Sequence, residues 1–362
     1  MSERASKKRN VQEKGRSKLE ESTTISKKPR KARKDALQEA LEGAGFSIFR
    51  RLRDLGFVAW QPPLTEKLKY KSLGNATASE IQAYTRFGQL PPRIVDIDNI
   101  SLPLTLSANP RKYIVAPRFP YAHIAVAPLY HAFTHCNVDK ESIDFVFGCS
   151  ALEVLVSCRT PKKAAPYLVM KVPGTNALML HYHFQFGQDY AQPGFQFERL
   201  MTQQNMQDAH NHVGTTEHVQ LMEIGGKRVL MTAEVDGVDA VGNPVELKLG
   251  SSGIGRKVMF QMIGSGSLTL IKGGNDKGIV RSIRSTNLAD IMSNVVSEEQ
   301  NTVAFLETKI LDGMNALKAF DDNGYFDNGK VYRIEFQPKM TLVPFGQNHP
   351  LLPPNPVLGE LF

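Results

Sequence analysis

One stretch, residues 228–248, constrains the fold of this chain more than any other. It holds two runs of apolar and β-branched residues separated by the turn signal Gly242–Asn243, which is the pattern of a β-hairpin. Both runs are too apolar for a solvent-exposed ribbon at the edge of a sheet. We therefore expect this hairpin to be central to a core.

Four charged residues interrupt these runs at alternating positions: Glu234, Asp236, Glu246 and Lys248. Because successive strand side chains point to opposite faces, Glu234 and Asp236 share one face, and so do Glu246 and Lys248. The two pairs meet on one face only if directly opposed positions sum to an even number, which requires a loop of odd length. We predict a loop of Val241–Asn243, with Asp236 opposite Lys248.

Three carboxylates and one lysine on one face predict a particular chemistry. Crowded carboxylates repel each other, and burying them is costly unless a positive charge compensates. Mg²⁺ and Mn²⁺ prefer oxygen ligands of this kind, and a nearby lysine can orient the attacking water or neutralise a phosphate. The pattern indicates a metal-dependent phosphodiesterase, whereas the alternative is a solvated hairpin with cross-strand salt bridges.

The ordered motifs resemble a known family. Glu234-Val-Asp236 followed by Glu246-Leu-Lys248 is similar to two motifs of the DXO (Dom-3 type) decapping exoribonuclease family, within the PD-(D/E)xK nuclease superfamily. Each motif is short, and only their combination in this order is specific.

Two flanking segments agree with this resemblance in order and spacing. Gly194–Glu198 is similar to the family motif whose glutamate helps to hold the metal, and Arg256–Gln261 is similar to the helix that brings a glutamine to the substrate. A weaker match extends from about Pro92 to Pro338.

The resemblance implies the roles of individual residues. One or two Mg²⁺ or Mn²⁺ ions would be held by five groups, namely Glu198, Glu234, Asp236, Glu246 and the carbonyl of Leu247. Asp236, Glu246 and Lys248 would be catalytic, with Lys248 positioning the water. The substrate would contact Glu198, Lys248 and Gln261.

The resemblance also implies the substrate, which is the 5′ end of RNA in capped, NAD-capped, triphosphorylated or monophosphorylated form. The expected reactions are removal of incomplete or NAD caps, release of pyrophosphate, and 5′→3′ exonucleolysis. Two alternatives remain open: a DNA-directed nuclease with the same type of site, which the 2′-OH would distinguish, and a weakened or inactive RNA-binding member of the family.

The sequence departs from the family pattern at two places. Phe147, Gly148 and Cys149 stand where the family has a tryptophan–arginine–glycine run, and a thiol cannot replace the bidentate phosphate clamp of an arginine. We expect Cys149 to be a core cysteine. The helix predicted over Arg256–Ile263 is shorter than in the family, because Gly264 and Gly266 follow it.

Composition indicates how the chain is organised. Residues 1–34 hold thirteen Lys and Arg against four Glu, whereas the rest of the chain holds 31 basic and 32 acidic residues. We expect residues 1–35 to be a disordered basic tail, residues 36–345 to form a single decapping-nuclease-like domain, and residues 346–362 to be a Pro-rich tail. The cluster Lys27–Lys34 fits a nuclear localisation signal, although a nonspecific RNA-binding or solubilising tail is the alternative.

The expected fold class is α/β of the mixed α+β type, with central mixed β-sheets flanked by helices. Alternation predicts strands over 167–172 and 177–186, and helical spacing predicts a long amphipathic helix over 302–319. The three cysteines lack metal-type spacing and are expected to be reduced. The chain has no apolar run of about eighteen residues and is polar from Ser2 onward, so we expect neither a membrane span nor a signal peptide.

Overall fold

The structure is a computed structural model of the 362-residue chain, and it describes residues 35–60, 78–106, 127–157, 167–182, 193–202, 215–250, 253–327, 330–336 and 339–345. The chain from Asp35 onward forms one compact unit. The predictions for the basic tail and for the Pro-rich tail lie outside the described residues.

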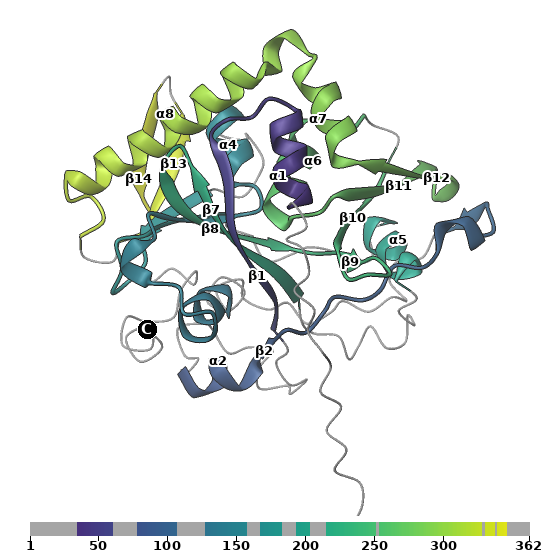
Figure 1. Cartoon of the computed structure of the whole chain (residues 1–362), viewed down its shortest axis with the longest axis horizontal. Coiled ribbons are helices and arrows are strands. Elements are labelled where there is room, and N and C mark those ends of the chain that lie inside the picture. Colours follow the sequence, from purple (N-terminus) through teal and green to yellow (C-terminus); the bar gives the residue numbers. More distant parts are fainter. Residues whose placement is uncertain are drawn as a thin grey trace, which may run out of the picture. The chain divides into compact units, whose positions relative to one another are not determined.

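A large mixed sheet forms the centre of this unit (Figure 1). Within the described residues its strands follow the order β14 (Met340–Pro344), β13 (Tyr332–Phe336), β5 (Tyr167–Lys171), β6 (Leu178–Tyr182), β4 (Phe145–Gly148), β8 (Lys227–Glu234), β7 (Thr215–Ile224), β1 (Phe49–Trp60) and β2 (Thr85–Phe87). Strand β4 is parallel to both of its neighbours, β6 and β8, and the other pairs are antiparallel. The strands predicted over 167–172 and 177–186 are confirmed as the antiparallel pair β5–β6 as far as Tyr182, and residues 183–186 lie outside the described residues.

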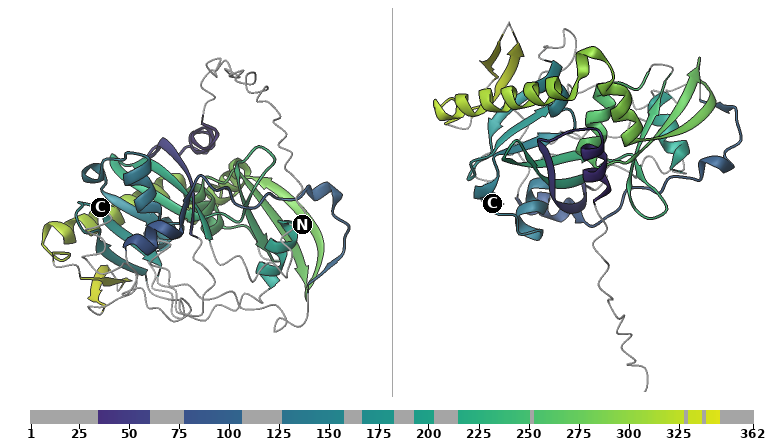
Figure 2. Two further views of the ribbon diagram at one scale, coloured as in Figure 1. Left: turned by 90° about the horizontal axis from the view of Figure 1, so that it is seen from below. Right: turned by 45° about the horizontal axis from the view of Figure 1, so that its top comes forward.

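A smaller mixed sheet lies beside the large one (Figure 2). Its described strands follow the order β3 (Leu104–Thr105), β12 (Ile279–Asn287), β11 (Thr269–Asp276), β10 (Pro244–Leu249) and β9 (Gly237–Val238), with β10 parallel to β11. Two mixed sheets flanked by helices confirm the predicted fold class.

The described helices are α1 (Ala36–Gly43), α2 (Ala78–Tyr84), α4 (Ala151–Ser157), α5 (Pro193–Met201), α6 (Arg256–Ser265), α7 (Leu288–Val296) and α8 (Val303–Asp322), with single short turns at His131–His135, Ile97–Asn99, Lys140–Ser142 and Glu299–Asn301. The long helix predicted over 302–319 is confirmed as α8. The predicted end of this helix at Ile263 is wrong by two residues, because α6 runs through Gly264 to Ser265. Gly266 ends the helix as expected, with a left-handed φ of 69°. None of the helices in these ranges is long and apolar enough to span a membrane.

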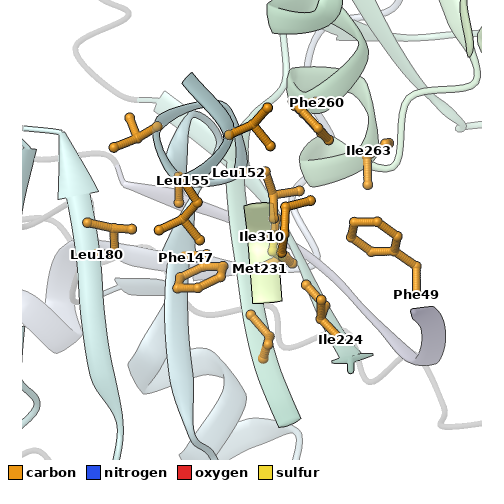
Figure 3. Close-up of a cluster of buried hydrophobic side chains, with 14 of the residues drawn as sticks. Phe49, Phe147, Leu152, Leu155, Leu180, Ile224, Met231, Phe260, Ile263 and Ile310 are labelled. Carbon is orange, nitrogen blue, oxygen red and sulfur yellow. The ribbon is translucent and has the colours of Figure 1, made fainter. Parts of the chain in front are cut away.

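The large sheet is buried on both faces. Along β8, Val229 and Met231 face a cluster that also includes residues of α1, α4, α6, α7 and α8, whereas Leu230 belongs to a cluster on the opposite face. Figure 3 shows Met231 and Phe147 beneath the side chains of Leu152 and Phe260. This strict alternation explains why the apolar runs around residue 230 are so continuous, since strands covered on both faces need apolar residues at every position.

The small sheet has its own apolar layer. Phe197 and Met201 of α5 pack against Val245 and Leu247 of β10, and all four side chains are almost fully buried. Because side chains alternate along β10, this packing directs Glu246 and Lys248 to the opposite side of the strand.

Candidate active site

The candidate site lies where the chain passes from one sheet to the other. Strand β8 of the large sheet ends at Glu234, and β9 of the small sheet begins at Gly237. The prediction of a single hairpin over 228–248 is therefore wrong, because its two apolar runs belong to different sheets. Both runs are central to buried structure, as expected, but β8 pairs with β7 and β4, whereas β10 pairs with β9 and β11.

The predicted register is also wrong by two residues. Val238 lies opposite Pro244 and Gly237 opposite Val245, so continuing this register places Asp236 opposite Glu246 and not opposite Lys248. The loop has odd length, as predicted, but it spans five residues, 239–243. The side chain of Asp239 accepts hydrogen bonds from the backbone N–H groups of Val241 and Asn243, both at 2.9 Å, and these bonds favour the longer turn over the short Val241–Asn243 loop.

Lys248 is the positive centre of this region. Its ammonium forms an ion pair with the Glu246 carboxylate and lies 3.9 Å from Asp236 Oδ2. The same Asp236 oxygen accepts a hydrogen bond of 2.7 Å from the backbone N–H of Leu247. The predicted catalytic residues Asp236, Glu246 and Lys248 are thus brought together, and their side chains are held by one another.

Glu198 and Glu234 reach the same cluster from other elements. Glu198 lies on α5, and its charge interacts with Asp236, Lys248, Glu234 and Glu246. Glu234, at the end of β8, is exposed to solvent, whereas Glu246 is only 4% exposed. Solvent therefore reaches the acidic cluster at Glu234 and in part at the half-buried Glu198 and Asp236.

The electrostatics of the cluster are those of crowded carboxylates. Burial raises the pKa of Glu198, with the charge of Asp236 adding to the effect and Lys248 opposing it. Although part of the Glu234 side chain reaches solvent, desolvation by the surrounding protein and then the charge of Asp236 raise its pKa to about 7, with Lys248 opposing the effect. The pKa of Lys248 is raised: burial lowers it, but the surrounding carboxylates outweigh burial, with Glu246 and Asp236 acting most strongly. The protein holds more negative charge here than one ammonium neutralises.

The donor set fits a hard divalent cation, since it consists of carboxylates beside a backbone carbonyl. In the described part of the chain, however, no three or more His, Cys, Asp or Glu side chains are spaced as the ligands of one ion. The Lys248 ammonium pairs with Glu246 in this structure, and the Leu247 N–H donates to Asp236. An ion binding at these carboxylates would compete with Lys248 for Glu246.

Gln261 is placed less clearly. It lies half-buried on α6, which packs against β7 and β8 of the large sheet. Among the contacts of the described residues, no hydrogen bond joins the Gln261 side chain to the carboxylates. Its role toward a substrate stays a prediction.

Cys149 differs from the expected core cysteine. It follows β4 directly, is half-buried, and its sulfur lies 3.6 Å from Ser150 Oγ. Burial raises the pKa of the Cys149 thiol to about 11, and the carboxylates of Glu246, Glu217 and Glu234 add to the effect. The residue where the family has its arginine run thus borders the acidic cluster as a neutral, weakly nucleophilic thiol.

Glu217 is a member of the cluster that sequence reasoning missed. It lies on β7 directly opposite Glu234 in the antiparallel pair β7–β8, and it is only 5% exposed. Burial and then the charge of Glu234 raise its pKa to about 8. One signal was present in the sequence, since Glu217 continues the alternation of Val219 and Leu221 toward a buried face.

Comparison with known proteins gives a match in structure only. No family model matches the sequence, and no curated protein matches it. Rai1 of Scheffersomyces stipitis, in complex with (3′-NADP)⁺ and a calcium ion, matches with a TM-score of 0.59 at 14% identity, over 87% of this chain and 97% of that one.

Two further structures agree. A variant of S. pombe Rai1 in complex with 3′-FADP matches with a TM-score of 0.56 at 13% identity, over 83% of this chain and 95% of that one. Dxo1 of K. lactis, in complex with manganese, matches with a TM-score of 0.52 at 9% identity, over 84% of this chain and 92% of that one. The chain therefore has the fold of the Rai1 and Dxo1 proteins, and the resemblance to the DXO family predicted from its motifs is confirmed as a shared fold.

Proposed function

We propose that this protein is a metal-dependent hydrolase that acts on RNA 5′ ends. Its reactions would be the removal of incomplete or NAD caps, the release of pyrophosphate and 5′→3′ exonucleolysis. The cofactor would be one or two Mg²⁺ or Mn²⁺ ions.

One observation carries this proposal: Glu198, Glu234, Asp236, Glu246 and Lys248 converge at the junction of the two sheets, on a fold shared with Rai1 and Dxo1. A fold alone does not define an activity, but this fold together with an unneutralised acidic cluster favours a nuclease site. Calcium and manganese in the S. stipitis and K. lactis structures give further support for a divalent ion.

The roles of the residues follow from their chemistry. Glu198, Glu234, Asp236, Glu246 and the Leu247 carbonyl would hold the metal, which would polarise the phosphate and lower the pKa of bound water. Lys248 would orient the attacking water and offset the negative charge that develops on the phosphate. The Asp236 carboxylate is oriented for its part by the Leu247 N–H.

The experiment compares matched RNAs that carry a 5′ monophosphate, a triphosphate, an unmethylated cap or an NAD cap. Each RNA is incubated with the full-length protein in Mn²⁺ and in EDTA, and the products are resolved by gel and mass spectrometry. We expect metal-dependent hydrolysis that a Glu234→Gln/Asp236→Asn double variant abolishes. The preferred 5′ end would show which substrate a site with Cys149 accepts.

The matched control is Glu223→Gln, because Glu223 lies on β7 and forms an exposed ion pair with Arg50. This variant should hydrolyse RNA at the wild-type rate. RNA binding without hydrolysis of any of the four RNAs would refute the proposal and favour an inactive RNA-binding protein. Equal hydrolysis of matched DNA would favour the DNA-directed nuclease.

We also propose that the cluster Lys27–Lys34 directs nuclear import. The test replaces its six basic residues by alanine in a fluorescently tagged protein. Unchanged nuclear accumulation of this variant would refute the proposal.

A further inference from the structure

Glu217 occupies a position that a folded protein rarely gives to a carboxylate. Its side chain is 5% exposed, and it faces Glu234 across the β7–β8 pair. The Cβ atoms of such directly opposed residues lie about 4.5–5.5 Å apart, and like charges at this spacing destabilise a sheet. The position therefore has a cost that some other interaction must offset.

The hydrogen bonds of Glu217 do not offset that cost. The Thr232 hydroxyl donates to its carboxylate, but Oε2 is fully buried and has no hydrogen-bond partner among the described residues. A buried polar atom without a partner costs about 1–3 kcal/mol, and more when it is charged. This oxygen is available to a ligand.

The charges around Glu217 do not offset the cost either. Lys248 compensates Glu246 and Asp236, whereas the side chains that interact with Glu217 are Glu234, Thr232 and the Cys149 thiol. None of these is basic, and Glu217 forms no ion pair within the described ranges of the chain. A buried carboxylate without such a partner stays protonated, and the raised pKa of Glu217 describes this metal-free state. Buried carboxylates that are ionised are generally paired with a cation or coordinate a metal.

The local topology brings these groups to one end of three neighbouring central strands of the large sheet. Strand β4 pairs with β8 through Gly148 and Thr232, and Thr232 in turn lies opposite Val219 of β7. Cys149 after β4, Glu234 at the end of β8 and Glu217 near the start of β7 therefore lie together. The structure provides two carboxylates and a thiol there, and the exposed Glu234 gives access from solvent.

We propose that Glu217 is a metal ligand of this protein, and that its carboxylate and that of Glu234 together hold a divalent cation. This inference rests on the proposed function, because it assumes that the acidic cluster binds metal. It adds a ligand from outside the motifs that the sequence indicates. It also gives Glu217 a positive charge of the kind that Lys248 gives to Glu246, Asp236 and Glu234.

The test measures Mn²⁺ binding directly, by calorimetric titration of the full-length protein. We expect Glu217→Gln to lose one bound ion or to weaken Mn²⁺ binding by about tenfold or more, since changing even the groups around a metal site typically costs about 10–100-fold in affinity. Glu223→Gln, on the same strand and the same face of β7, should bind Mn²⁺ as the wild type does. Wild-type stoichiometry and affinity in Glu217→Gln would overturn the proposal.

A second measurement uses the wild-type protein and does not depend on the folding of a variant. Crystals soaked in Mn²⁺ should show an anomalous peak at metal–oxygen distance from the Glu217 carboxylate, about 2.0–2.6 Å. Mn²⁺ bound only at Glu198, Asp236 and Glu246 would overturn the proposal. Metal binding at Glu217 without RNA hydrolysis would support this inference and refute the proposed function. RNA hydrolysis with no metal at Glu217 would support the proposed function and overturn this inference.

Discussion

The candidate site contains two pairs of carboxylates whose surroundings differ. Asp236 and Glu246, at the small sheet, share the ammonium of Lys248. Glu217 and Glu234, in the large sheet, face each other with no basic side chain acting on Glu217 in the described part of the chain. The fold therefore supplies Asp236 and Glu246 with a close ammonium, whereas Glu217 receives no positive charge from the described side chains and is mostly protonated near pH 7 without metal.

The largest expected effect concerns Glu217, on which no basic side chain acts within the described ranges. The pKa of Glu217 is about 8 in the folded protein, against an ordinary value of 4.5. Between these values the folded state binds more protons than the unfolded state, so stability falls as pH rises. We expect metal-free protein to lose up to roughly 4 kcal/mol from this group between pH 4.5 and pH 8.

Glu217→Gln removes this titration, so its stability should depend much less on pH. The measurement is the free energy of urea unfolding in EDTA at pH 5 and pH 8.5, for both proteins. Any pH dependence of the unfolding free energy that remains in the variant comes from other groups, such as Glu234. Identical pH dependence in the two proteins would show that Glu217 is not buried in the way the structure describes.

The next largest effect concerns the ion pair between Lys248 and Glu246. Lys248→Met leaves the buried Glu246 without its cation, and breaking a buried pair from one side costs about 3 kcal/mol. We expect this loss in urea unfolding at pH 8 without metal. The double variant Glu246→Gln/Lys248→Met should recover most of the loss. Equal stability of the single and double variants would mean that the two side chains are not coupled.

A smaller effect tests the loop that sets the register of β9 and β10. Asp239 accepts hydrogen bonds from Val241 and from both nitrogens of Asn243, and these bonds lower its pKa against the opposing effect of burial. Asp239→Ala should cost about 1 kcal/mol in urea unfolding. Asn243→Ala, which keeps the two backbone bonds, should cost less. The reverse order would show that the side-chain bond controls the loop.

The smallest expected effect concerns Glu223, which lies on the same face of β7 as Glu217. Glu223 forms an exposed ion pair of 2.7 Å with Arg50, and such pairs contribute about 0–1 kcal/mol. Glu223→Gln should change the free energy of unfolding by less than about 0.5 kcal/mol, with no change in pH dependence between pH 5 and pH 8.5. A change in pH dependence as large as that of Glu217→Gln would mean that the first prediction reflects strand β7 as a whole and not Glu217 in particular.

Local patterns in the sequence determined much of this protein. Alternating apolar residues indicated β5 and β6, helical spacing indicated α8, and the charged positions of the two short motifs indicated Glu234, Asp236, Glu246 and Lys248. These features are readable because side-chain direction repeats every 2 residues in a strand and every 3.6 in a helix. The odd number of residues in the loop after Val238 also followed from the alternation of strand side chains.

Only the tertiary structure decided which strands pair. The chain crosses from the large sheet to the small one between Glu234 and Gly237, and β10 pairs with β11 in parallel. Local periodicity does not encode such partners, because the same alternation serves a hairpin and two strands in separate sheets. The pairing of β7 with β8 places Glu217 opposite Glu234, and for that reason the sequence motifs indicated only part of the acidic cluster.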